Sequence, residues 1–206
     1  MSARGAFVTV EGIDGAGKSS HLDFLCERAR AKGAQVVRTR EPGGTPAAEK
    51  MRELVLHHPM DGLAEALVMF AARGDHLAQV IEPALASGVW VVCDRFSDAT
   101  YAYQCGGRGM APGVVETLEQ LVHPRLQPDA TFLFDLDPAE AYARQRAASR
   151  DPDRFEREQA DFFVRVREAY LERARRHPQR IHVIDASGPL GQVRERLAQA
   201  FARAFP

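Results

Sequence analysis

The chain has 206 residues, of which 45% are hydrophobic and 27% are charged, and its formal net charge at pH 7 is −1. This composition is typical of a folded globular chain, which we expect to form one domain over residues 1–206, and it excludes an intrinsically disordered protein. The near-zero net charge provides no overall basic field, so we expect no nucleic-acid partner.

The cysteines and the N-terminal segment point to a cell compartment. Cys26, Cys93 and Cys105 form no CxxC pair and no metal-ligand spacing. The first apolar run covers only residues 6–10, which is too short for a signal peptide or a membrane span. We therefore expect a cytoplasmic protein with reduced thiols and no membrane attachment.

Short apolar runs alternate with longer segments of helical period. The predicted strands are 6–10, 34–39, 89–94, 130–136 and 180–185. The predicted helices are 19–32, 47–56, two within 62–86, 112–122, 138–148, 154–176 and 190–205. Nearly continuous apolar runs are typical of strands covered on both faces, so the alternation predicts an α/β fold with five parallel strands.

A glycine-rich segment links the first predicted strand to the first predicted helix. Gly12, Ile13, Asp14, Gly15, Ala16, Gly17, Lys18 and Ser19 match GxxxxGK[ST] at every fixed position, and Ser20 follows. In such a loop, backbone N–H groups surround phosphates, the lysine reaches the β- and γ-phosphates, and the serine coordinates Mg²⁺. A chance glycine-rich turn is the competing interpretation. The strand–loop–helix context favours a site for a nucleoside triphosphate.

Charged residues also end the second and third predicted strands. Ligands of open α/β sheets bind at these carboxyl ends. Asp94 is therefore a candidate for holding the water shell of Mg²⁺, Arg95 for bridging a transferred phosphoryl group, and Arg40 for binding phosphate. A simple Asp94–Arg95 ion pair is the alternative. The sequence contains no guanine-reading Asn-Lys-x-Asp tetrad, which argues against a GTPase.

Arginines are dense between residues 143 and 158. They are Arg144, Arg146, Arg150, Arg154 and Arg157. A solvated charged face is the usual explanation of such a run. A lid over about 143–157 that closes arginines over phosphates is the interpretation we favour, because phosphoryl transfer requires positive charge and exclusion of water.

These motifs together resemble the bacterial thymidylate (dTMP) kinase family. The family's EGxDGxGK[ST] stands at Glu11 to Ser19, and its TREPGGT stands complete at residues 39–45. Its DR element opens DRFSDATYAYQ at residues 94–104, and its lid-region DRxE stands at 153–156. TREPGGT is much more specific to the family than the phosphate-binding loop is.

The resemblance implies the reaction ATP + dTMP ⇌ ADP + dTDP, with Mg²⁺ as cofactor. It also implies a P-loop NTPase-type three-layer fold with strand order 2-3-1-4-5, an arginine-rich lid and a homodimer. Residues 12–20, with Lys18, would hold the ATP phosphates. Ser19 would bind Mg²⁺, and Asp94 would contact the ion through water.

The resemblance further implies residues for dTMP. Asp14 would read the sugar 3′-hydroxyl, and Arg40 and Arg95 would face the monophosphate. Phe70 would stack on thymine, although plain core packing is its interpretation without the family. The remaining candidates are Arg73 at the carbonyl edge of the base, Thr100 and Gln104 close to the base, and Tyr103 against the sugar.

Family members differ in the origin of the catalytic arginine. Some carry a basic residue before the last glycine of the loop, where this chain has Ala16. The lid should then supply the arginine, with Arg150 as the first candidate and Arg146 as the second.

Two alternatives stay open at this point. One is a kinase for another deoxynucleotide or a deoxynucleoside. Deoxynucleoside kinases use an acidic base, for which Glu11 is not obviously placed. The other is a P-loop nucleotide switch or a nucleic-acid-dependent ATPase, which the charge balance disfavours.

Overall fold

The computed structural model describes residues 4–147, 158 and 160–206. Within these residues lies a five-stranded sheet, formed by β1 (Phe7–Glu11), β2 (Val36–Arg40), β3 (Trp90–Asp94), β4 (Ala130–Asp135) and β5 (Ile181–Asp185). Every neighbouring pair is parallel, in the order β2-β3-β1-β4-β5. The predicted parallel α/β fold and the strand order implied by the family resemblance are both confirmed.

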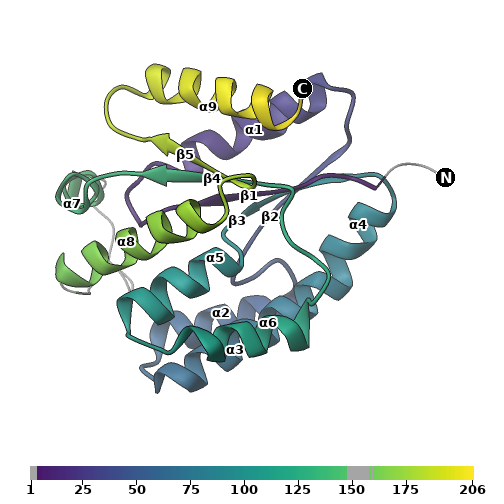
Figure 1. Cartoon of the computed structure of the whole chain (residues 1–206). Helices are drawn as coiled ribbons and strands as arrows, with labels where there is room; N and C mark the ends of the chain where they lie inside the picture. The colour runs from purple at the N-terminus through teal and green to yellow at the C-terminus, as the bar shows by residue number, and fades with distance from the viewer. Residues whose placement is uncertain (1–3, 148–157, 159) are drawn as a thin grey trace.

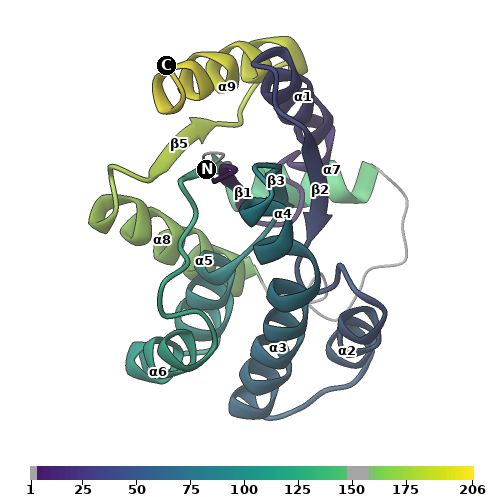
Figure 2. The same cartoon turned by 90° about the vertical axis from the view of Figure 1, so that its right-hand side faces the viewer.

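Helices cover both faces of the sheet (Figure 1). On one face, α1 (Ser19–Ala31) packs against β2 and β3, and α9 (Leu190–Ala204) packs against β4 and β5. On the other face, α8 (Ala160–Arg176) packs against β4 and β5, and α4 (Glu82–Ala86) packs against β3. The turned view in Figure 2 shows α1 and α9 together on one side of the sheet, opposite α8.

Four further helices lie around these two layers. α2 (Pro46–His57) and α6 (Pro112–Val122) both pack on α3 (Gly62–His76), and α7 (Pro138–Ala147) follows β4. None of the helices in the described part of the chain is both long and apolar enough to cross a bilayer.

The burial of the strands explains their sequences. All five residues of β1 are buried, as are the first five of β4, because helices cover both faces of the central strands. The edge strand β2 has no buried residue and alternates between half-buried and exposed positions. Nearly continuous apolar runs therefore mark the centre of a parallel sheet.

Two helical segments show features that the sequence did not predict. Residues 62–86 form one continuous helical run, in which the π-helical turn η1 (Leu77–Ile81) joins α3 to α4. The two helices predicted within this segment are present as α3 and α4, and the π turn joins them without a loop. The π turn lies just before Pro83, which has no N–H to continue a regular ladder.

The second difference is a helical segment that we did not predict. It comprises α5 (Ser97–Thr100) and the π-helical η2 (Tyr101–Gly107). Its inward face has no apolar stripe that would reveal a helix in the sequence, because the buried residues include the polar Ser97, Asp98, Thr100 and Gln104. The segment packs closely on α8, where a Cβ added at Gly107 would lie 2.4 Å from the Phe162 ring.

The carboxyl ends of the strands meet at one edge of the sheet. Asp94 at the end of β3 pairs in register with Val10 of β1 and with Arg40 of β2. Hydrogen bonds extend this alignment beyond the strands, from Glu41 N to Asp94 O at 2.8 Å and from Arg95 N to Val10 O at 2.9 Å. The segments after β1, β2 and β3 are therefore held side by side.

Candidate active site

The glycine-rich loop between β1 and α1 has the backbone that its sequence predicts. Gly12 and Gly15 have φ values of 136° and 83°, in the region that favours glycine. A Cβ at Gly12 would lie 2.4 Å from the Phe134 carbonyl oxygen, and one at Gly15 would lie 2.4 Å from that of Ala141. Both positions therefore require glycine for conformation and for space.

The Lys18 side chain lies inside this loop. Its Nζ donates to the carbonyl oxygens of Gly12 at 2.8 Å and of Ile13 at 2.9 Å. Burial and the positive charge of Arg95 lower the pKa of Lys18 to about 8. Ser19 and Ser20 begin α1 at the end of the loop, and both are exposed. The arrangement places an ammonium group beside the first N–H groups of α1, which together suit the binding of an anion.

Asp94 offers a buried acceptor close to the loop. Its Oδ1 is buried and has no hydrogen-bond partner within the described part of the chain. No cluster of three or more His, Cys, Asp or Glu side chains that could hold a metal occurs among the described residues. A carboxylate oxygen in this state fits the water shell of a magnesium ion, and the hydroxyl of Ser19, the first residue of α1, is of the kind that coordinates the ion.

Arg95 connects the loop to three elements. Its Nη2 donates to Asp14 Oδ1 at 2.7 Å and to the Tyr103 hydroxyl at 2.9 Å. Its Nη1 donates to the Tyr170 hydroxyl at 3.0 Å. The Tyr170 hydroxyl donates in turn to Glu11 Oε2 at 2.7 Å. These bonds orient one guanidinium group at the carboxyl edge of the sheet.

Asp14 stays ionised in this environment. Burial alone would raise the pKa of Asp14, but the positive charges of Arg95 and Lys18 lower it to about 2. The Tyr103 hydroxyl adds a hydrogen bond to Asp14 Oδ2 at 2.8 Å. Burial and this carboxylate raise the pKa of Tyr103 well above its ordinary value, so Tyr103 keeps its proton and acts as a donor.

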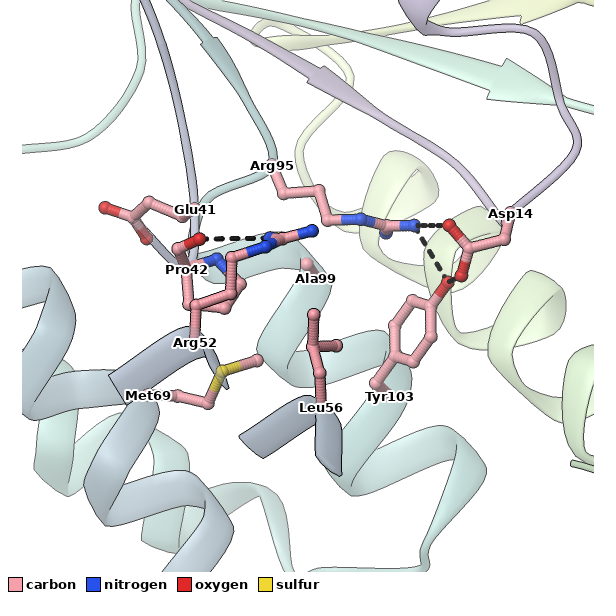
Figure 3. A pocket seen from close by; sticks show the side chains of 9 residues that line it. All are labelled: Asp14, Glu41, Pro42, Arg52, Leu56, Met69, Arg95, Ala99 and Tyr103. Atoms are coloured by element: carbon pink, nitrogen blue, oxygen red, sulfur yellow. Dashed lines mark hydrogen bonds and ion pairs between the residues drawn. The ribbon is translucent and has the colours of Figure 1, made fainter. Parts of the chain in front are cut away.

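A pocket opens beside this group, between the loop and helices α2 and α3 (Figure 3). It is lined by Asp14, Glu41, Pro42, Arg52, Leu56, Met69, Arg95, Ala99 and Tyr103. Figure 3 shows the guanidinium groups of Arg52 and Arg95 along one side of the pocket, with Leu56 and Met69 below them. The pocket thus has a cationic side that suits a phosphate group and an apolar side that suits a base, as the binding of a nucleoside monophosphate would require.

Two of the predicted substrate residues lie elsewhere. Among the described residues, the lining includes Arg52 and Met69 but neither Arg40 nor Phe70. Arg40 is half exposed and donates to Glu49 Oε2 at 2.7 Å. The Phe70 ring is buried and stacks on His123, with ring centroids 6.0 Å apart and nearly parallel planes. The plain core-packing interpretation of Phe70 therefore agrees with its position.

Three further predicted residues are buried behind the pocket. Arg73 is 3% exposed and donates from Nε to Glu41 Oε2 at 2.7 Å and from Nη2 to Thr100 Oγ1 at 3.2 Å. Gln104 donates to the buried Glu65 at 2.8 Å. The structure therefore brings Arg73 and Thr100 into direct contact, next to the pocket residue Glu41.

Of the lid candidates, Arg150 lies outside the described residues. Arg146 ends up exposed on α7, where its guanidinium lies 5.9 Å from the Tyr142 ring centroid. Arg144 is closer to the phosphate-binding loop, because a Cβ at Gly17 would lie 3.9 Å from its Nη1. Arg144 also donates to the carbonyl oxygen of Ala186, after β5, at 3.2 Å.

Sequence reasoning missed several residues that line or order the pocket. Arg52 and Leu56 are four residues apart on α2 and so share a helix face, a spacing that could have singled them out. Met69 and Tyr170 carry no such signal, because each lies in an apolar helical stripe that reads as core.

Comparisons with known proteins cover most of the chain. The thymidylate kinase family model matches residues 10–197. The thymidylate kinase of Methylobacillus flagellatus is 57% identical over 192 residues, which are 93% of this chain and 94% of that protein. The thymidylate kinase of Bordetella petrii is 56% identical over 197 residues, 96% and 95% of the two chains. The crystal structure of thymidylate kinase from Ehrlichia chaffeensis has a TM-score of 0.78 at 33% identity, covering 97% of this chain and 99% of that chain.

Proposed function

The chain belongs to the thymidylate kinase family, and we propose on this premise how its residues hold ATP and dTMP. As a thymidylate kinase it converts ATP and dTMP to ADP and dTDP. The dTMP phosphate oxygen is already a nucleophile, so the chain has to position two phosphates and neutralise charge, and no strong base is needed.

The donor side is the glycine-rich loop. We assign the ATP phosphates to the backbone of residues 12–20 and to the Lys18 ammonium, which the loop carbonyls already hold in place. When bound, Mg²⁺ would neutralise charge on the phosphates. Ser19 and, through water, Asp94 would hold it, and the buried Oδ1 of Asp94, which has no hydrogen-bond partner among the described residues, supports this assignment.

The acceptor phosphate belongs between Arg95 and Arg52. Both guanidinium groups line the pocket, and planar guanidinium groups suit bidentate binding of phosphate. Arg52 thus takes the role that we expected of Arg40, whose guanidinium pairs with Glu49. Arg95, which directly follows β3, is a second catalytic arginine beside the one from the lid, because its position next to the loop lets it contact the transferred group.

The nucleoside part of dTMP fits the rest of the pocket. Asp14 accepts from the sugar 3′-hydroxyl beside Tyr103, and Leu56 and Met69 pack on the base. Met69 replaces Phe70 in this assignment, since the Phe70 ring packs on His123. Arg73 donates to the carbonyl edge of the base, with Thr100 and Gln104 ordering the wall behind it.

The single observation that carries this assignment is the Asp14–Arg95 contact at 2.7 Å, because it joins the phosphate-binding loop to the pocket. A coupled ADP-release assay tests it, with Mg-ATP and, separately, dTMP, dUMP, dCMP, dGMP, AMP and thymidine. We expect a strong preference for dTMP. Activity on thymidine but not on dTMP would instead indicate a nucleoside kinase, and no acceptor-dependent ADP would favour a nucleotide switch.

The lid, the assembly and the compartment are also proposals. Arg150 supplies the lid arginine, and Arg146 is the second candidate.

The proposed homodimer uses α3, where Leu63 and Leu67 lie one turn apart and are each 49% exposed. Light scattering should show a dimer that Leu67→Glu dissociates. A cytoplasmic location agrees with the free thiols of Cys26, Cys93 and Cys105.

A further inference from the structure

A buried chain of polar contacts runs behind the pocket and ends at a histidine that the function above does not use. His76, on α3, is 0% exposed. Its Nε2 lies 2.7 Å from Thr39 Oγ1 on β2, and its Nδ1 lies 3.1 Å from Glu41 Oε1. The other carboxylate oxygen of Glu41 accepts from Arg73 Nε at 2.7 Å. The imidazole therefore connects strand β2 to the carboxylate that holds Arg73.

The proton positions follow from the partners. Burial raises the pKa of Glu41, but Arg73 and His76 outweigh this effect and lower it, so the carboxylate is ionised and only accepts. His76 Nδ1 must then carry a proton and donate to Glu41. In the neutral ring, Nε2 accepts from the Thr39 hydroxyl. The tautomer with its proton on Nδ1 thus satisfies both neighbours, because Nδ1 donates to Glu41 and Nε2 accepts from Thr39.

Arg73 depends on this carboxylate for its orientation. Its guanidinium carbon lies 4.5 Å from the Phe70 ring centroid and 4.9 Å from that of Phe96. Nε is bonded to Glu41 and Nη2 to Thr100, whereas Nη1 is buried with no partner within the described residues. An unsatisfied buried guanidinium N–H is costly, so it indicates a donor kept for a ligand.

The chain of contacts borders the pocket at Glu41 and lies close to it at Arg73. Glu41 lines the pocket directly. Arg73 is one helical turn after the lining residue Met69, on the same face of α3. The backbone at Gly44 also lies close to the imidazole, because a Cβ added there would lie 2.4 Å from His76 Nε2. Movement of the ring would therefore be transmitted to Glu41 and to the turn after β2.

We propose that His76 is a positioning residue for recognition of the pyrimidine base: by donating from Nδ1 to Glu41, it fixes the carboxylate that orients Arg73. The inference rests on the proposed function, because it takes Arg73 Nη1, which has no partner in the described part of the chain, as the donor to a base carbonyl. It predicts an effect on the acceptor nucleotide and on base selectivity, with no direct effect on ATP.

Two variants of one position separate this role from plain packing. His76→Asn keeps an amide N–H where Nδ1 stands, and so keeps the donor to Glu41. His76→Gln places its amide near Nε2, and so keeps the Thr39 contact but loses the donor to Glu41. Steady-state kinetics would give KM for dTMP, KM for ATP, kcat and the dTMP/dCMP ratio of kcat/KM, with Tm as a measure of folding.

We expect His76→Gln to raise KM for dTMP about tenfold and to lower the dTMP/dCMP ratio, as loss of a hydrogen bond to a charged group implies. KM for ATP should stay unchanged, and His76→Asn should stay close to the wild type. Equal KM values for dTMP in the two folded variants would overturn the proposal. The proposal would also be overturned if KM for dTMP, KM for ATP and kcat all changed together in proportion to the change in Tm, because such a pattern indicates a structural role only.

The wild-type assay separates this proposal from the function on which it rests. A wild type that does not use dTMP contradicts the proposed function, whereas equal variants of a dTMP-using enzyme contradict only the role of His76. If neither variant folds, long-range nitrogen–proton NMR of the wild type tests the same point, with Thr39→Val assigning the His76 signals. A proton on Nδ1 supports the proposal, and a ring protonated only on Nε2 overturns it.

Discussion

Arg95 and Asp14 come from the segments after two neighbouring strands, and a hydrogen bond of 2.7 Å joins Arg95 Nη2 to Asp14 Oδ1. The backbone of Arg95 has a φ of 69°, which residues with a Cβ rarely adopt. The next residue, Phe96, donates its backbone N–H to Glu11 Oε1 at 2.7 Å and so anchors this turn. The strand β1 therefore fixes both the phosphate-binding loop and the arginine that faces it.

Lys18 provides the most direct test of the donor site. Lys18→Ala should abolish turnover with little change in Tm, because the hydrogen bonds of Lys18 Nζ to the described residues go to loop carbonyls and its ion pair, at 4.0 Å, goes to the Asp14 carboxylate. Lys32→Ala is the matched control, since Lys32 bonds the Pro206 carbonyl oxygen at the surface. Normal turnover in a folded Lys18→Ala protein would contradict the phosphate assignment.

Arg52 and Arg40 are a pair of basic residues that the structure distinguishes. Arg52→Ala should raise KM for dTMP about tenfold or more, because it removes a charged donor from the acceptor phosphate. Arg40→Ala should change KM for dTMP little, since that side chain is half exposed and pairs with Glu49. Isothermal titration with dTMP and with thymidine locates the effect. A loss of affinity equal for both ligands would show that Arg52 does not read the phosphate.

The arginine and apolar residues of the pocket show where sequence reasoning reaches its limit. The glycine pattern and the strand-end Asp94-Arg95 predicted the loop and the edge of the sheet, because these features depend on local backbone and on parallel topology. Met69 and Phe70 are both apolar and adjacent on α3, so only the helix rotation decides which one faces the pocket. The choice of Arg52 over Arg40 depends likewise on a partner, Glu49, that sequence spacing does not reveal.

Met69 and Phe70 should therefore respond in opposite ways to truncation. Met69→Ala should raise KM for dTMP several-fold with a small change in stability, because Met69 is a half-buried wall of the pocket. Phe70→Ala should lower the free energy of unfolding by about 3–5 kcal/mol, as is typical of a buried phenylalanine. Urea denaturation and dTMP titration measure the two effects. Unchanged KM in Met69→Ala would remove Met69 from the base site.

The lid arginine can be tested by kinetics alone. Arg150→Ala should lower kcat far more than it raises KM, as expected for a contact made chiefly in the transition state. Arg146→Ala is the comparison, because Arg146 is exposed on α7 beside Tyr142. Single-turnover rates with saturating ATP and dTMP separate chemistry from product release. An unaltered kcat in Arg150→Ala, with a lowered one in Arg146→Ala, would transfer the role to Arg146.

Glu11 connects the site to the stability of the fold. Burial, with the negative charge of Asp98, raises the pKa of Glu11 from 4.5 to about 7. The folded protein thus binds this proton more tightly than the unfolded chain does. The contribution of Glu11 to stability is therefore fully present below pH 4.5 and is lost as the pH rises through 7.

Glu11→Gln removes this pH dependence, because an amide does not ionise. The amide can still accept from Phe96 N, which Glu11 Oε1 does at 2.7 Å. Between pH 4.5 and 8.5, the free energy of unfolding of the wild type should fall by about 3 kcal/mol relative to the variant, which corresponds to the pKa shift. Urea titrations of both proteins at the two pH values measure the difference, in which all other titrating groups cancel.

Glu172→Gln, on the exposed surface of α8, is the control. Hydrogen bonds from Arg176 and Arg175 lower the pKa of Glu172, so the free energy of unfolding of the wild type relative to this variant should not fall between the two pH values. A wild-type-minus-variant difference that is equal at the two pH values would show that Glu11 ionises at its ordinary pKa in the folded protein.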